Sequence, residues 1–275
     1  MRYFRFKNGQ LSADAQEASA PQWFRDLVAA LHTRLTEARD LQRQDLPADL
    51  PRSPFPCYFA PIAKTKGSLR YTYLSDNERS HPDAFVEAVR EYQRESPHIR
   101  PLGALLLFVE TSPEVTTRGQ YEAVFWSLLQ YLHDQDGSPW PATTSPDPDD
   151  PQWQFCFGGE PWFLVGKAPF YQRRKSRWAD GLMLLVQTQK MLDPVDGYRP
   201  EADSIRQRIR AAMTQYDGMP PSPDLEVVGD PAFRDWRQYW LRDTNEEPGP
   251  ARCPLRLHPL LKTPGAVTAA GPSSG

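Results

Sequence analysis

The chain has 275 residues, enough for one large domain or two small ones with a sizeable core. Its 32 basic and 35 acidic residues give a net charge of -3, which excludes a global field that would recruit nucleic acid or an anionic membrane. Three cysteines without CxxC spacing, no secretory h-region and no long apolar run predict a cytoplasmic protein without a membrane span.

Hydrophobic periodicity and proline or glycine clusters predict an alternation of helices and strands. In chain order, the expected elements are a helix at 21–38, a proline-rich connector at 45–56, a turn at 64–67, a strand at 69–74, a helix at 81–96, a strand at 103–110, a helix at 118–133, a hairpin at 153–166, a strand at 181–187, and helices at 204–216 and 231–241. In the hairpin, Gly158 and Gly159 supply the positive φ of the turn.

Consecutive strands mixed with helices, and the lack of a glycine-rich βα turn, favour an α+β fold. We expect a single domain over residues 1–241, with a largely antiparallel sheet packed against helices. Residues 242–275 are rich in Pro, Gly, Ala and Ser and show almost no periodicity. They are expected to form a disordered C-terminal tail.

His133 ends an apolar helix and is followed by Asp134 and Asp136. A histidine in the last turn interacts favourably with the negative end of the helix, which is the ordinary role of such a residue. The same side chain could instead bind a metal or haem iron, with its second ring nitrogen fixed by a carboxylate such as that of Asp136. Helix physics alone favours the first role.

Two further features carry candidate chemistry. Cys57 and Cys156 lie among aromatic residues, where each is either a buried small hydrophobe or a thiolate ligand to iron. The basic stretch YQRRKSR, residues 171–177, is either a solvated loop or a site for carboxylates and phosphates, because arginine offers paired donors to planar anions. Flanking aromatic residues leave nucleic-acid binding as a third interpretation of this stretch.

Several stretches in this order resemble the bacterial YqcI/YcgG family: FPCYFA, KTKGSLRYTYL, LLQYLHDQDGSPWP, DPDDPQWQFCFGGEPWFLV and APFYQRRKSR. The resemblance spans roughly residues 55–192 and lies in the succession of motifs. The residues that carry it are Phe55, Pro56, Cys57, Gly67, Arg70, Leu132, His133, Asp136, Trp140, Pro141, Trp153, Phe155, Gly158, Gly159, Pro169, Arg174, Ser176 and Arg177.

The resemblance implies a haem-dependent N-hydroxylase, because the better understood branches of the family, those of D-cycloserine and guanitoxin biosynthesis, are haem proteins that hydroxylate nitrogen. It implies haem b, dioxygen as co-substrate, a redox partner or other reductant, an amine or guanidine substrate of bacterial specialised metabolism, and a possible homodimer. His133 would be the metal ligand, with Cys57, Arg70, Arg174 and Arg177 as further cofactor-binding residues. Asp134, Asp136 and Glu160 would be the catalytic residues that orient a cationic substrate.

The chain departs from the pattern of the hydroxylase branch at one point. Lys167 and Ala168 stand where Leu and His are expected before the proline of APFYQRRKSR. If that histidine is the axial ligand of the hydroxylases, either His133 or a cysteine binds iron here, or haem has been lost. The alternative function is therefore a non-haem protein that binds a small ligand or partner through residues 171–177.

Overall fold

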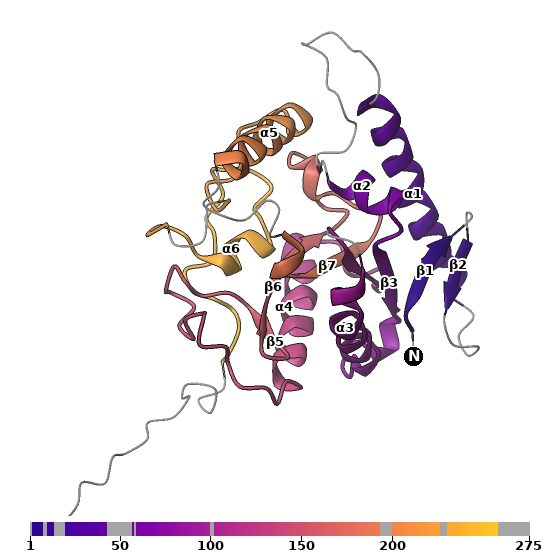
Figure 1. The fold of residues 1–275 in the computed structure, drawn as a ribbon, viewed down its shortest axis with the longest axis horizontal. Helices are drawn as coiled ribbons and strands as arrows, with labels where there is room; N and C mark the ends of the chain where they lie inside the picture. Colours follow the sequence, from indigo (N-terminus) through magenta and orange to yellow (C-terminus); the bar gives the residue numbers. More distant parts are fainter. Residues whose placement is uncertain are drawn as a thin grey trace, which may run out of the picture.

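The computed structural model describes residues 2–7, 10–13, 20–42, 57, 59–99, 102–192, 200–225 and 230–257. Within these residues, one seven-stranded sheet has the strand order β2-β1-β3-β4-β7-β6-β5 (Figure 1). The strands are β1 (Phe4–Lys7), β2 (Gln10–Ala13), β3 (Leu69–Leu74), β4 (Ala104–Val109), β5 (Cys156–Phe157), β6 (Glu160–Lys167) and β7 (Leu182–Thr188). Only β3 and β4 pair in parallel within this sheet, so the predicted α+β domain with a largely antiparallel sheet is confirmed.

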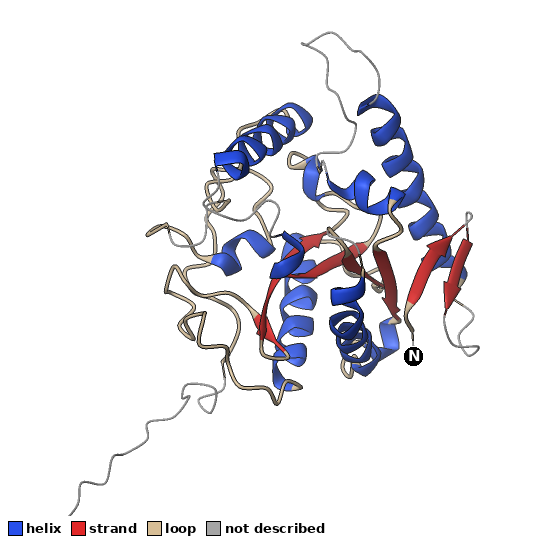
Figure 2. Ribbon diagram, viewed as in Figure 1, coloured by secondary structure: helices blue, strands red, loops and turns tan. Residues whose placement is uncertain are grey.

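Helices cover both faces of the sheet, as Figure 2 shows. The longer helices are α1 (Gln22–Gln42), α3 (Asp83–Glu95), α4 (Arg118–Asp134) and α5 (Pro200–Asp217), and the short ones are α2 (Phe59–Thr65) and α6 (Asp235–Tyr239). The central strand β4 is buried along its whole length because its side chains alternate between two cores. Leu105 and Leu107 pack with α3, α4 and α6, whereas Leu106 and Phe108 pack with α1.

The β5–β6 hairpin forms as predicted. Phe157 pairs with Glu160, and the two residues between them, Gly158 and Gly159, have φ values of 61° and 75°. This left-handed backbone is the conformation that a two-residue hairpin turn requires and that glycine adopts without strain.

The structure differs from the predicted elements at four places. The β1–β2 hairpin was not predicted, and residues 59–65 form α2 before the turn at Lys66 and Gly67. The last helix spans only residues 235–239, because Trp240 leaves the helical conformation with φ of -131° and packs against the sheet. Residues 242–257 also pack on the domain, with Leu255 buried in its core, so the domain extends beyond Leu241.

Other expectations fall outside the described residues: the connector at 45–56 and the predicted tail beyond Leu257. In the described part of the chain, no helix is long and apolar enough to cross a membrane.

Candidate functional site

His133 lies in the last turn of α4 and is 1% exposed. The chain turns away directly after it, because its backbone carbonyl accepts a hydrogen bond from the N–H of Asp136. The carboxylate of Asp136 accepts from the N–H groups of Ser138 (2.9 Å) and Gly158 (2.8 Å). Asp136 thereby ties the end of α4 to the turn of the β5–β6 hairpin, which is a structural role for a predicted catalytic residue.

Glu160 lies at the same hairpin and Asp134 at the same end of α4. Glu160 accepts a hydrogen bond from Gln93 at 2.8 Å and forms an ion pair with Lys190 at 3.1 Å. Asp134 is exposed, and its carboxylate accepts from a side-chain neighbour one helical turn away, Gln130. The three predicted catalytic carboxylates thus lie at the His133 end of α4, and both Asp136 and Glu160 already have protein partners.

Arg70 belongs to a separate cluster at the edge of α3. Its guanidinium group holds the carboxylate of Glu95 through two hydrogen bonds, and Tyr3 and Arg5 of the N-terminal strand donate to the same carboxylate. Arg70 therefore anchors the N-terminal hairpin, and its guanidinium is fully engaged by Glu95 and by the backbone carbonyls of residues 67 and 69. Its predicted role as a cofactor-binding residue has no support in these contacts.

The stretch 171–177 is not a fully solvated loop. Arg173 and Lys175 are exposed, but Arg174 is 0% exposed and Arg177 is 6% exposed. The segment after α6 covers Arg174, which donates to the carbonyl of Arg242 (2.6 Å) and to the Asn245 side chain (2.7 Å). Arg177 donates to the carbonyl of Gln238 at 3.1 Å.

Each of the two buried guanidinium groups has one N–H donor group that no described residue accepts from. The Nη1 atoms of Arg174 and Arg177 are buried and have no hydrogen-bond partner among the described residues. Burial lowers the pKa of Arg177 to about 10, and burial also lowers the pKa of Arg174. Buried donors of this kind are rare unless water or a ligand satisfies them. The pair is suited to bind a carboxylate or another planar anion.

The buried loop is also held from the side of α5. The carboxylate of Asp217 accepts hydrogen bonds from the backbone N–H (2.6 Å) and the hydroxyl (2.7 Å) of Ser176. Asp217 thereby partly offsets the positive charge of Arg174 and Arg177, and Asp243 does the same for Arg174. Sequence reasoning missed Asp217 because its partner lies 41 residues earlier in the chain.

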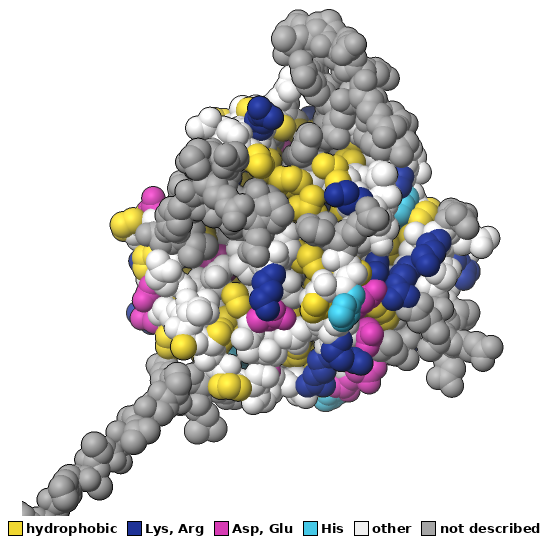
Figure 3. Space-filling model, viewed as in Figure 1, with side chains coloured by type: hydrophobic (Ala, Val, Ile, Leu, Met, Phe, Trp, Pro, Cys, Tyr) yellow, Lys and Arg dark blue, Asp and Glu magenta, His cyan; other side chains and the backbone are white. Residues whose placement is uncertain are grey.

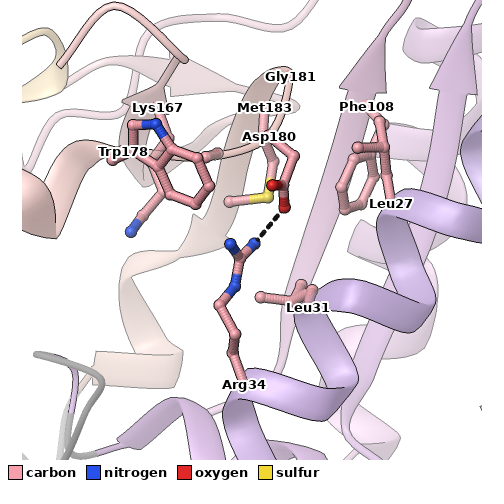
Figure 4. Close-up of a pocket in the computed structure, with 10 residues that line it drawn as sticks. Leu27, Leu31, Arg34, Phe108, Lys167, Trp178, Asp180, Gly181 and Met183 are labelled. Carbon is pink, nitrogen blue, oxygen red and sulfur yellow. Dashed lines mark hydrogen bonds and ion pairs between the residues drawn. The ribbon is translucent and has the colours of Figure 1, made fainter.

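Lys167 is the last residue of β6, and its side chain lies near α1. It lines a cavity of about 20 Å³ together with Trp178, Met183, and the ion pair of Arg34 with Asp180 (Figure 4). That volume suits about one water molecule. The Nζ atom of Lys167 donates to the carbonyl of Ser176 at 2.6 Å.

Burial, with a smaller contribution from Arg177, lowers the pKa of Lys167 to about 8, whereas the Cys57 thiol acts in the opposite direction. Cys57 therefore lies within electrostatic range of Lys167. Contrary to its interpretation as a small buried hydrophobe, Cys57 is exposed. Cys156 does match that interpretation: it is buried, and burial raises the pKa of its thiol to about 12.

The lowered pKa of Lys167 predicts a pH-dependent stability. Between pH 8 and 10.5 the unfolded chain binds more protons at this lysine than the folded chain does, so its contribution to stability rises with pH in that window. Relative to Lys167→Met, the wild type should gain on the order of 2 kcal/mol of unfolding free energy across the window. Urea unfolding at several pH values measures this gain.

The exposed Lys175 on the same loop is the matched control for this prediction. Relative to Lys175→Met, the wild type should show no such gain with pH. An equal gain against both variants would contradict a lowered pKa at Lys167.

His133 and the two buried arginines lie near opposite ends of α4. Tyr121 stacks on Phe170 with ring centroids 6.0 Å apart, close to the basic loop. His133 follows Tyr121 by 12 residues on the same helix, which at about 1.5 Å per residue places it about 18 Å away. His133 is therefore at one end of α4, and Arg174 and Arg177 are at the other.

Charges on the face drawn in Figure 3 are mixed in sign. Among the described residues of that face, Lys and Arg side chains lie interspersed with Asp and Glu and form no continuous basic stripe. Nucleic-acid binding through a phosphate-tracking surface would use such a stripe.

Comparison with known proteins gives one family and three curated relatives. A model of the YqcI/YcgG family matches residues 46–256. The uncharacterized proteins YcgG and YqcI of Bacillus subtilis (strain 168) are 29% and 30% identical over 205 and 215 residues, covering 73% and 76% of this chain and 80% and 83% of theirs. A Streptomyces lavendulae protein named "Putative N(omega)-hydroxy-L-arginine synthase DcsA" is 28% identical over 233 residues, covering 82% of this chain and 81% of its own. No solved structure matches the chain.

Proposed function

Because the chain belongs to the YqcI/YcgG family, we propose that it is an oxygenase that hydroxylates an amine or guanidine nitrogen of a small amino-acid-like substrate. The observation that carries the proposal is the similarity, over 82% of this chain, to the Streptomyces lavendulae relative whose printed name is that of an N-hydroxy-arginine synthase. From the resemblance of the sequence motifs to the haem-dependent branches of the family, we add haem b and dioxygen to the proposal, with a reductant or redox partner as the electron source.

The described residues fit this cofactor only in part. Haem carries carboxylates, and the unsatisfied Nη1 donors of Arg174 and Arg177 suit such groups. His133 does not fit as the iron ligand of a haem held by these arginines, because it lies about 18 Å along α4 from Tyr121, which is the residue of that helix that stacks on Phe170 beside the basic loop. The cavity beside Lys167, at about 20 Å³, also has no room for a porphyrin.

Cys57 is the better candidate ligand in this arrangement. It is exposed and lies within electrostatic range of Lys167, and cysteine is one of the side chains that ligate haem iron. Haem, when bound, would supply the activation of dioxygen. The residues of the chain would hold its carboxylates, shield the site from water and orient the substrate nitrogen.

Haem titration followed by absorption spectroscopy tests the cofactor. We expect saturable binding, a Soret band that shifts in Cys57→Ser, and an unchanged band in His133→Ala. Loss of the band in His133→Ala would restore His133 as ligand and contradict the site proposed above. Absence of saturable binding in the wild type would remove haem from the proposal.

Product analysis tests the activity itself. The protein with haem, a reductant and ¹⁸O₂ should convert L-arginine or a related amine into a product that carries one labelled oxygen on nitrogen, measured by mass spectrometry. Unlabelled substrate throughout a panel of amines and guanidines, with haem shown to be bound, would contradict N-hydroxylation.

A second candidate is a non-haem protein that binds a small anion through residues 171–177. The unsatisfied donors of Arg174 and Arg177, and the replacement of the expected histidine by Ala168, favour it. It predicts no haem binding, and stabilisation by a small carboxylate that Arg177→Met abolishes. Thermal unfolding with and without the carboxylate measures this effect.

A further inference from the structure

A second cavity, of about 190 Å³, lies between α6 and the segment that follows it. Its walls are the side chains of Asp224, Arg237, Trp240 and Arg242, and the short stretch 249–251. The volume is several times that of one water molecule and below that of a drug-sized pocket. A small organic molecule is the size of ligand that it suits.

Two N–H groups of the cavity residues lack acceptors. The Nε1 atom of Trp240 and the Nε atom of Arg242 are buried and have no hydrogen-bond partner among the described residues. The benzo edge of the Trp240 ring faces Gly166 of β6, so the edge that carries Nε1 points away from the sheet. Both groups can only donate, and an acceptor in the cavity would satisfy them.

Among the residues that line the cavity, positive charges outnumber negative charges by one. Arg242 is compensated, because its guanidinium pairs with Asp224 at 2.9 Å and also donates to the carbonyl of Glu247. Arg237 lies over the Trp236 ring at 5.2 Å, and none of the hydrogen bonds or ion pairs among the described residues involves its side chain. One uncompensated guanidinium with two unsatisfied donors matches a monoanion.

We propose that this cavity binds the carboxylate of a small organic acid or amino acid, held by Arg237, Trp240 and Arg242. The cavity is distinct from the unsatisfied donors of Arg174 and Arg177, although the Arg242 backbone contacts Arg174. The proposal concerns binding alone, so it can succeed or fail independently of N-hydroxylation.

The indole N–H of Trp240 is the reporter for the test. In protein labelled with ¹⁵N-tryptophan, the signal that disappears in Trp240→Phe is assigned to it. Propionate should shift this signal saturably, whereas propylammonium and propionamide, of similar size, should not. Equal shifts with propionate and propionamide, or no saturable shift with propionate, would overturn the proposal.

Matched variants locate the charge that binds the anion. Arg237→Gln should weaken propionate binding about tenfold, the scale of one lost charge-assisted hydrogen bond. The exposed Arg252 is close in sequence to the cavity but does not line it, so Arg252→Gln should leave the affinity unchanged. Equal losses in both variants would show a general charge effect and refute the site. L-arginine binding more tightly than agmatine, which lacks the carboxylate, would extend the result to amino acids.

Discussion

Replacing Glu95 by Gln should destabilise the fold by about 3 kcal/mol at neutral pH, because it removes the one carboxylate that Arg70 and Arg5 share. The Arg70 side chain is 5% exposed and would be left as a buried cation without a countercharge. Tyr3 would also lose its charged acceptor, and with it β1 would lose its main polar attachment to α3. Urea unfolding of the variant and the wild type measures the difference.

The same carboxylate should give a pH signature. Burial alone would raise the pKa of Glu95, but hydrogen bonds from Arg70, Tyr3 and Arg5 outweigh it and lower the pKa to about 2, from an ordinary value of 4.5. Its contribution to stability is therefore fully present above pH 4.5 and is lost as the pH falls towards 2. The stability difference between wild type and Glu95→Gln should shrink over that window.

Glu91 is the matched control, since it lies one turn earlier on α3 and pairs with Arg94, whose side chain is 70% exposed. Glu91→Gln should change stability by less than about 1 kcal/mol, as an exposed ion pair does, and should show no comparable pH dependence. If the two variants were equally destabilised, Glu95 would have no special role in anchoring the N-terminal hairpin.

Helices and strands could be predicted from the sequence where a local pattern of apolar residues or glycines determines the structure. The short continuous apolar run of β4 and the two glycines of the β5–β6 turn are examples, because burial on both faces and positive φ each require particular residue types within a few positions. The β1–β2 hairpin was missed because Arg5 and Tyr3 find their partner at Glu95, some 90 residues away. The sequence of a four-residue strand does not indicate a contact with a residue so far away in the chain.

The candidate site was harder to predict for a related reason. A run of basic residues normally faces water, and the burial of Arg174 and Arg177 depends on contacts with α6 and with the segment that follows it. That segment is rich in proline and glycine and lacks hydrophobic periodicity, so its composition predicts a disordered tail and gives no sign that it packs on the domain. His133 was a candidate because it ends an apolar helix, but the local sequence does not show that it lies at the other end of α4 from the arginines.

Replacing Gly166 by Ala should destabilise the protein by about 1–3 kcal/mol, because Trp240 and Phe125 leave no space for a methyl group at this position of β6. A Cβ atom at this position would lie 2.8 Å from Cζ3 of Trp240 and 3.0 Å from Cδ2 of Phe125. The backbone of β6 is held on one side by β7, so the Trp240 ring has to move. Because Trp240 also lines the 190 Å³ cavity, the variant should weaken carboxylate binding as well.

A double-mutant cycle separates this clash from a general loss of strand stability. Trp240→Phe removes the benzo ring whose edge faces Gly166, so Gly166→Ala should cost less in that background, by about 1 kcal/mol or more. Urea unfolding of the four proteins gives the coupling energy. Additive effects would mean that Gly166 is needed for the conformation of β6 and not for contact with Trp240. Carboxylate binding by Trp240 would then not depend on the residue at position 166.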